Sequence, residues 1–196
     1  MFERFKGSGK AIAEAIAQAL VATGVSPTQL TLIGFALNLA VAVVLGAGYL
    51  QVGGALVILA GAFDSLDGAL ARVANRKTTF GAFLDSTLDR YSEAALLLGL
   101  LYDASRRGDL AVEVLAYVVI VGSLLVSYTR ARAEGLGLDC EVGIAPRPER
   151  VIILGLGLIL GLELPALAIL AVLTHVTAVQ RIFHVYALTK AQPTKS

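Results

Sequence analysis

The sequence predicts an all-α integral membrane protein, with six transmembrane helices and an N-terminal helix that lies in the membrane interface. Hydrophobic residues make up 57% of the 196 residues, and the mean hydropathy is +0.77, well above the values of soluble domains. The apolar residues come in long blocks, and a membrane span needs about 20 such residues. The basic residues fall mostly at the same ends of these blocks, as expected for a multi-pass protein.

The apolar blocks define the predicted spans. They lie near residues 29–49, 52–72, 80–102, 110–130, 150–162 and 164–188. The fifth block is short and can extend back to Pro148. Because the blocks occupy nearly the whole chain, we expect one membrane domain over residues 1–196.

The segment before the first span has a helical pattern of its own. Within residues 9–23, the polar residues Lys10, Glu14 and Gln18 are four apart and therefore share one helix face. We interpret residues 1–25 as a juxtamembrane amphipathic segment in the membrane interface. The alternative is an ordinary amphipathic helix packed on the rest of the protein. Ser26 and Pro27 then mark the start of the first span, as N-cap and first helical residue.

The charge distribution predicts the topology. An even number of spans puts both termini on one side of the membrane, and most basic residues fall on that side, whereas Arg106 and Arg107 fall on the other. The positive-inside rule therefore places both termini in the cytoplasm of a cell-membrane protein. The single cysteine, Cys140, excludes an internal disulfide.

Four aspartates stand where a membrane protein tolerates charge least. Asp64 and Asp67 are three apart, and Asp85 and Asp89 are four apart, so each pair shares a helix face. We expect the second and third spans to be antiparallel neighbours joined by a short polar loop, so that the four carboxylates converge just inside the cytoplasmic surface. Each costs roughly 2.5–3.5 kcal/mol in the bilayer, so a compensating partner is required. Carboxylate oxygens favour Mg²⁺ or Mn²⁺, and two such ions would clamp a diphosphate.

Small residues accompany the acids. Gly68, Ala71 and Gly81 remove bulk beside the carboxylates, which permits either close approach of a ligand or close helix packing. The alternative role for the acids themselves is structural ion pairing with nearby basic residues, which are Arg72, Arg76, Lys77 and Arg90.

The full pattern, D-x2-D-G-x2-A-R-x8-G-x3-D-x3-D from Asp64 to Asp89, resembles the signature of the CDP-alcohol phosphotransferase family. The resemblance implies a six-helix membrane domain that commonly forms homodimers. It also implies a reaction in which an alcohol attacks the β-phosphorus of a CDP-lipid, such as CDP-diacylglycerol, and CMP leaves.

The family's functional residues carry over by position. The resemblance implies that Asp64, Asp67, Asp85 and Asp89 hold two Mg²⁺ or Mn²⁺ ions, and that Asp89 is also the base for the acceptor hydroxyl. The implied nucleotide-binding residues are Asp67, Gly68, Ala71, Arg72 and Gly81. The predicted topology places these aspartates, and with them the active site, on the cytoplasmic side.

A second basic set bears on the acceptor. Its members fall at the predicted cytoplasmic side and are Arg130, Arg132, Arg147, Arg150 and Arg181. Arginines suit phosphate, which favours a phosphorylated acceptor, whereas the alternative is that they anchor the protein to lipid headgroups.

The sequence around Arg130, Arg150 and Arg181 resembles the prokaryotic phosphatidylinositol-phosphate synthases, in which the matching residues hold inositol 1-phosphate. One position departs, because that subfamily usually has Lys where this chain has Arg130. The resemblance implies transfer of a phosphatidyl group to inositol 1-phosphate. The alternatives are glycerol 3-phosphate as acceptor and CDP-archaeol as donor.

Two other classes fit parts of the pattern. Intramembrane prenyltransferases use acidic motifs on more distant helices of longer chains, whereas here the four aspartates fall within 26 residues. A divalent-cation transport protein would more often place its acids near the bilayer midplane. His175 and His184, in the last span, are interpreted as packing or interface residues rather than metal ligands.

Overall fold

The computed structural model describes residues 15, 17–19, 21, 24–74 and 78–191. These ranges contain six long helices, α2 (Pro27–Gly46), α3 (Leu50–Val73), α4 (Thr79–Arg107), α5 (Leu110–Glu134), α6 (Arg147–Ile159) and α7 (Glu163–Ala191). The all-α prediction is confirmed. The predicted amphipathic segment over residues 9–23 lies largely outside the described residues.

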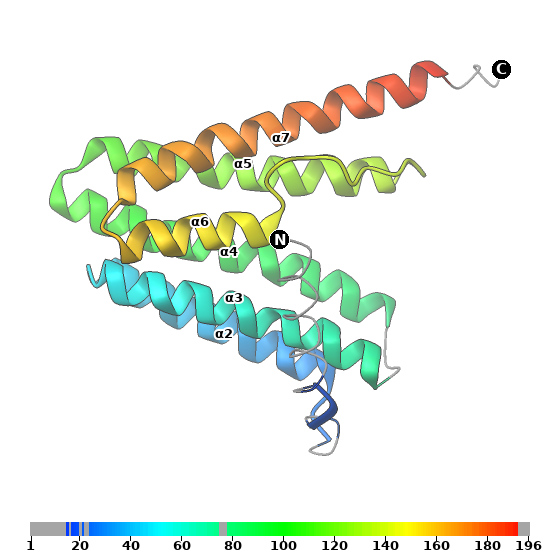
Figure 1. The fold of residues 1–196 in the computed structure, drawn as a ribbon, viewed down its shortest axis with the longest axis horizontal. Helices are drawn as coiled ribbons and strands as arrows, with labels where there is room; N and C mark the ends of the chain where they lie inside the picture. The colour runs from blue at the N-terminus through cyan, green and yellow to red at the C-terminus, as the bar shows by residue number, and fades with distance from the viewer. Residues whose placement is uncertain (1–14, 16, 20, 22–23, 75–77, 192–196) are drawn as a thin grey trace.

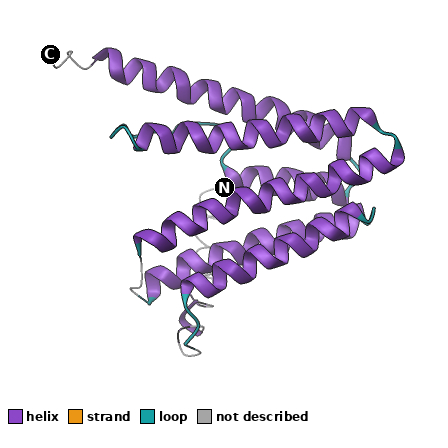
Figure 2. Ribbon diagram, turned by 180° about the vertical axis from the view of Figure 1, so that it is seen from behind, coloured by secondary structure: helices purple, strands orange, loops and turns teal. Residues whose placement is uncertain are grey.

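The helices pack in a closed ring (Figures 1 and 2). Going around it, α2 packs against α3, α3 against α6, α6 against α7, α7 against α5, α5 against α4, and α4 back against α2. Each helix therefore has two main neighbours, and α4 and α6 face each other across the ring.

Four helices are long and apolar enough to cross a membrane by length and composition, namely α2, α3, α5 and α7. The helix α4 has 29 residues but carries many charged side chains. The helix α6 has 13 residues, which span about 20 Å at 1.5 Å per residue, less than a bilayer core of about 30 Å.

Local sequence signals set the helix ends. Ser26 caps α2 with a full capping box, in which Gln29 Oε1 accepts a hydrogen bond from the Ser26 backbone N–H at 2.9 Å. The first predicted span was placed at 29–49, but α2 ends at Gly46 because Gly48 turns the chain at φ +89°. Thr78 caps α4 by accepting the Gly81 N–H at 3.0 Å.

Glycines allow close helix contact around the ring. A Cβ on Gly99 of α4 would collide with the Ala42 carbonyl of α2, and a Cβ on Gly54 of α3 would lie 2.7 Å from the Gly155 carbonyl of α6. These obstacles are backbone atoms, which cannot rotate away. The small-residue packing expected of membrane helices is therefore present at both contacts.

The end of the ring opposite the acidic signature is tied by Arg107. Its Nε donates to Asp103 at 2.7 Å, and its Nη2 donates to Glu163 at 2.9 Å, which connects the end of α4 to the start of α7. The buried apolar core includes Leu45 and Leu100 near this end. This end of the bundle is thus closed by packing and ion pairs.

Replacing Gly99 by Ala is expected to destabilise the protein by about 1–3 kcal/mol, because overpacking against a backbone carbonyl has no relief through rotamer change. The measurement is the thermal unfolding midpoint of purified protein in detergent. The matched control is Gly68→Ala, whose added Cβ would meet only Arg72 Nη1, at 3.6 Å. Equal midpoints for the two variants would contradict the close packing of α2 and α4.

Candidate functional site

The four signature aspartates lie around one cavity of about 490 Å³. Asp64 and Asp67 come from α3, whereas Asp85 and Asp89 come from α4. The prediction that these two helices are direct neighbours is wrong, because α3 packs against α2 and α6, whereas α4 packs against α2 and α5. The carboxylates instead meet around α2, which separates the two acidic helices.

The helix α2 supplies partners that sequence reasoning missed. Thr31 Oγ1 donates to Asp67 Oδ2 at 2.7 Å, and Asn38 Nδ2 lies 3.3 Å from both carboxylate oxygens of Asp64. Gly34 leaves room for Asp64, since a Cβ there would lie 2.6 Å from Asp64 Oδ1. A polar Asn inside an apolar block is the sequence signal that could have indicated this supporting role.

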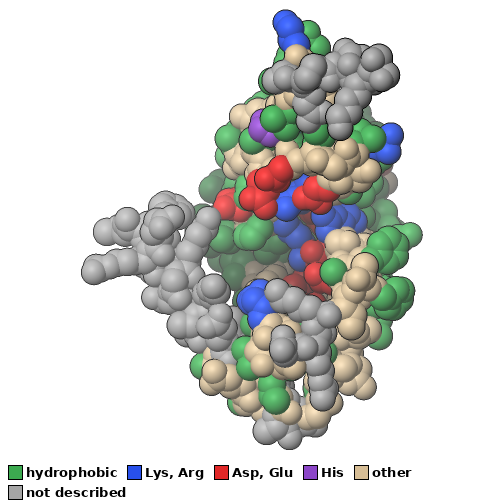
Figure 3. All heavy atoms as spheres, turned by 90° about the vertical axis from the view of Figure 1, so that its right-hand side faces the viewer, with side chains coloured by type: hydrophobic (Ala, Val, Ile, Leu, Met, Phe, Trp, Pro, Cys, Tyr) green, Lys and Arg blue, Asp and Glu red, His purple; other side chains and the backbone are tan. Residues whose placement is uncertain are grey.

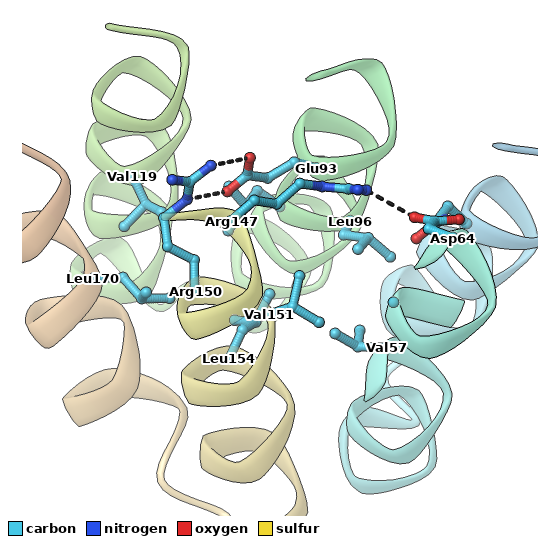
Figure 4. Close-up of a pocket in the computed structure, with 13 residues that line it drawn as sticks. Val57, Asp64, Glu93, Leu96, Val119, Arg147, Arg150, Val151, Leu154 and Leu170 are labelled. Atoms are coloured by element: carbon cyan, nitrogen blue, oxygen red, sulfur yellow. Dashed lines mark hydrogen bonds and ion pairs between the residues drawn. The ribbon is translucent and has the colours of Figure 1, made fainter. Parts of the chain in front are cut away.

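Arg147 is the principal counter-ion of the aspartates. Its Nη2 donates to Asp64 Oδ2 at 2.8 Å (Figure 4). Its Nη1 lies 2.6 Å from Asp89 Oδ1. One guanidinium therefore bridges the first and last acids of the signature, from α3 to α4. The predicted structural partner Arg90 contributes only a longer contact, at 3.8 Å from Asp89.

A second cavity, of about 290 Å³, adjoins the first. It is lined by all five residues predicted to bind a nucleotide, which are Asp67, Gly68, Ala71, Arg72 and Gly81. Thr28 and Thr31 of α2 also line it. Asp67 and Asp85 line both cavities, so these carboxylates lie at the boundary between the two.

The arginines predicted to bind the acceptor phosphate differ in their burial and in their partners. Arg150 is 4% exposed, and it donates to both oxygens of Glu93 at 2.7 Å and to the Ala145 carbonyl at 2.8 Å. Arg130 is paired with Glu134 at 2.7 Å and with Glu141 at 3.3 Å. Arg132 is exposed at the end of α5.

Arg181 differs from the other buried arginines. It is 5% exposed, and its guanidinium donates to the backbone carbonyls of Val142 and Val126. Among the described residues no carboxylate forms a salt bridge with it. Arg130, Arg150 and the carboxylate of Glu134 all lie near enough for their charges to act on it. A buried positive charge held only by carbonyl groups is suited to bind an anion.

Figure 3 views the end of the bundle that carries these groups. Lys and Arg side chains gather with Asp and Glu side chains in and around a central hollow. Charged groups from separate helices therefore meet at one end of the ring, opposite the end tied by Arg107.

The donor set of this centre fits a hard divalent cation, because the four aspartates offer only oxygen ligands around one cavity. Across the described residues, no three acidic, imidazole or thiol groups converge as a ready coordination shell. Arg147 instead supplies the positive charge between Asp64 and Asp89. The same carboxylate oxygens would have to turn from Arg147 toward a metal ion.

The sequence indicates that His175 is a packing residue rather than a metal ligand. His175 Nδ1 lies 2.9 Å from the Ala171 carbonyl on its own helix, as expected for a packed histidine. Cys140 is a buried free thiol in the loop between α5 and α6.

Comparisons with known proteins agree on one family. Residues 24–188 match the family model of the CDP-alcohol phosphatidyltransferases. The chain is 35% identical to an archaetidylinositol phosphate synthase of Pyrococcus horikoshii, over 93% of this chain and 95% of the relative. It is 38% identical to a phosphatidylinositol phosphate synthase of Mycobacteroides abscessus, over 87% and 81% of the two chains.

A solved structure has the same architecture. The phosphatidylinositol phosphate synthase of Mycobacterium tuberculosis with CDP-DAG bound aligns with a TM-score of 0.83 and 34% identity, over 90% of this chain and 94% of the other. A second structure of that protein, in complex with manganese and citrate, aligns with a TM-score of 0.79, over 89% and 88% of the two chains. This chain therefore belongs to the CDP-alcohol phosphatidyltransferase family, and it is a membrane transferase of the type that makes phosphatidylinositol phosphate or archaetidylinositol phosphate.

Proposed function

We propose that the protein transfers the phosphatidyl group of CDP-diacylglycerol to inositol 1-phosphate, and that phosphatidylinositol phosphate and CMP are the products. The observation that carries this proposal is Arg181, a buried cation held by carbonyl groups beside Arg130 and Arg150. An acceptor that already carries a phosphate would supply the missing negative charge. The names of the relatives support inositol phosphate over glycerol 3-phosphate.

The donor would lie across the two adjoining cavities. Gly68 would leave space for the cytidine. Arg72 lies beside Gly68, where it would contact the nucleotide. The diphosphate would then face Asp67 and Asp85, at the boundary between the cavities. Two divalent cations, Mg²⁺ or Mn²⁺, held by the four aspartates would neutralise the charge of the diphosphate and polarise it. Binding of manganese by the relative of known structure supports this assignment.

In the proposed reaction, Asp89 takes the proton from the acceptor hydroxyl, whose oxygen then forms a bond to the β-phosphorus. The bond between that phosphorus and the oxygen of CMP breaks, and CMP leaves with the bonding electron pair. Arg147 holds Asp89 and Asp64 before loading, so it must release both carboxylates for this chemistry. The chain contributes mainly positioning and charge compensation, as is usual in phosphoryl transfer.

A second donor, CDP-archaeol, is favoured by a specific observation. The archaetidylinositol phosphate synthase of Pyrococcus horikoshii aligns over 93% of this chain. The lipid tails of either donor would contact generic apolar surface. The same headgroup chemistry would therefore serve both donors.

The proposal includes the orientation of the protein. We infer that α4 and α6 complete a set of six spans, because both belong to the same closed ring as the four apolar helices. Both termini and the active site would then face the cytoplasm of the cell membrane, in agreement with the distribution of basic residues. The proposal also keeps residues 1–196 as a single domain, residues 1–25 as an interfacial segment, and a homodimer as the assembly.

The direct test of the proposed function is CMP release by purified protein with Mg²⁺. CDP-diacylglycerol and CDP-archaeol are each offered with inositol 1-phosphate, glycerol 3-phosphate or no acceptor. We expect release with inositol 1-phosphate that exceeds release with glycerol 3-phosphate. Release with glycerol 3-phosphate alone would overturn inositol 1-phosphate as the acceptor. Greater release from CDP-archaeol than from CDP-diacylglycerol would identify CDP-archaeol as the donor.

Replacing Asp89 by Asn is expected to abolish turnover while CDP-lipid binding persists. Removal of a general base typically costs about 10²–10⁴-fold in rate. The measurements are CMP release and binding of the CDP-lipid to detergent-solubilised protein. Turnover equal to that of the wild type would exclude Asp89 as the base.

Replacing Arg181 by Gln is expected to raise the KM for the acceptor by roughly tenfold or more, and the KM for the CDP-lipid by far less. The reason is loss of the buried charge that meets the acceptor phosphate, since a hydrogen bond to a charged group contributes about 1.5–3 kcal/mol. The control is Arg106→Gln, an arginine at the opposite end of the bundle that stacks on Tyr102. Equal changes in both KM values would argue against a phosphate pocket at Arg181.

A further inference from the structure

Glu93 is a buried carboxylate that none of the predicted roles uses. It lies one helical turn beyond Asp89 on α4, and its side chain is 13% exposed. Its Oε1 accepts from Arg150 Nε at 2.7 Å, and its Oε2 accepts from Arg150 Nη2 at 2.7 Å (Figure 4). Ser123 of α5 donates to Oε1 at 2.9 Å. The carboxylate thus joins α4, α5 and α6 inside the ring.

These contacts fix the orientation of Arg150. A guanidinium has five N–H donors, and Glu93 takes one from Nε and one from Nη2, while the Ala145 carbonyl takes one from Nη1. One N–H on each terminal nitrogen is left without a partner among these contacts. Arg150 therefore enters any binding event with its planar fork already set, which removes the conformational cost of ordering a long side chain.

Glu93 also keeps the charges of the two α6 arginines separate. Arg150 shares a small cavity of about 20 Å³, lined mainly by apolar side chains, with Asp64 and Arg147. A buried arginine without its own carboxylate would compete for Asp64, since an unpaired buried charge is costly. Because Glu93 pairs with Arg150, Arg147 is the α6 arginine that pairs with Asp64 and Asp89.

The ion pairs formed by the two arginines of α6 differ in whether the proposed function requires them to break. Arg147 binds Asp64 and Asp89, which are both assigned to metal ions in the proposed function. Arg150 binds Glu93, which is outside that set. The Glu93–Arg150 pair is therefore the connection across the ring that remains after Arg147 is released.

We propose that Glu93 is a positioning residue for the acceptor, which acts by holding Arg150 so that its two unbonded N–H groups face the acceptor phosphate. This inference rests on the proposed function, because it assumes a phosphorylated acceptor at Arg150. Ser123 supports the same role by orienting the Glu93 carboxylate.

The test compares Glu93→Gln, Ser123→Ala, Arg150→Gln and the double variant Glu93→Gln/Arg150→Gln in full-length purified protein. The readouts are the KM for acceptor and the KM for CDP-lipid, measured by CMP release. For Glu93→Gln we expect a rise of about tenfold in the acceptor KM and a change below about twofold in the donor KM, as for loss of a charge-assisted contact. For Ser123→Ala we expect a smaller rise, with the same selectivity.

The double variant separates positioning from a structural role. If Glu93 acts through Arg150, adding Glu93→Gln to Arg150→Gln leaves the acceptor KM unchanged. A further rise, or equal rises in both KM values, would overturn the proposal. If Glu93→Gln does not fold, the Ser123→Ala variant tests the proposal instead. An unchanged acceptor KM in Ser123→Ala would then overturn the proposal.

Failure of the proposed function gives a different result. In that case the wild type itself releases no CMP with inositol 1-phosphate, whatever the variants do. The KM comparison is then made with the phosphorylated acceptor that the wild type does use, and the expected selectivity for that acceptor is the same.

Discussion

Charge compensation inside the ring is the constraint on which the rest of the structure depends. Asp64, Asp89 and Glu93 stand within a helical bundle whose outer faces are apolar, where an unpaired charge costs several kcal/mol. Two arginines on one short helix meet these three acids, Arg147 the first two and Arg150 the third. The helix α6 can supply both because it lies across the ring from α4.

This arrangement separates a fixed part of the site from a part that can rearrange. Glu93 and Arg150 are largely enclosed and paired with one another, whereas Arg147 and its aspartates line the open cavity. The aspartates need a second source of positive charge to release Arg147, and divalent cations with a CDP-lipid diphosphate would provide it under the proposed function. The apolar and ion-paired opposite end, with Arg107 between Asp103 and Glu163, keeps the helices in place while that exchange occurs.

The sequence predicted the helices and the meeting of the four aspartates, because hydropathy and residue spacing are local signals. It did not predict that α3 and α4 both pack on α2, or that Asn38 and Glu93 support the site, because these contacts depend on tertiary arrangement. Arg147 was expected at the acceptor phosphate, whereas the structure pairs it with Asp64 and Asp89. Spacing along the chain cannot tell which of several basic residues reaches a given carboxylate.

The account is tested most directly by titrating Mn²⁺ into the protein without substrates and measuring free Mn²⁺ by electron paramagnetic resonance. Wild type is compared with Arg147→Gln, and Arg106→Gln at the opposite end serves as the control. If Arg147 competes with metal ions for Asp64 and Asp89, Arg147→Gln binds Mn²⁺ more tightly, by about tenfold or more, since a hydrogen bond to a charged group contributes about 1.5–3 kcal/mol. An affinity equal to or weaker than that of the wild type would contradict the account.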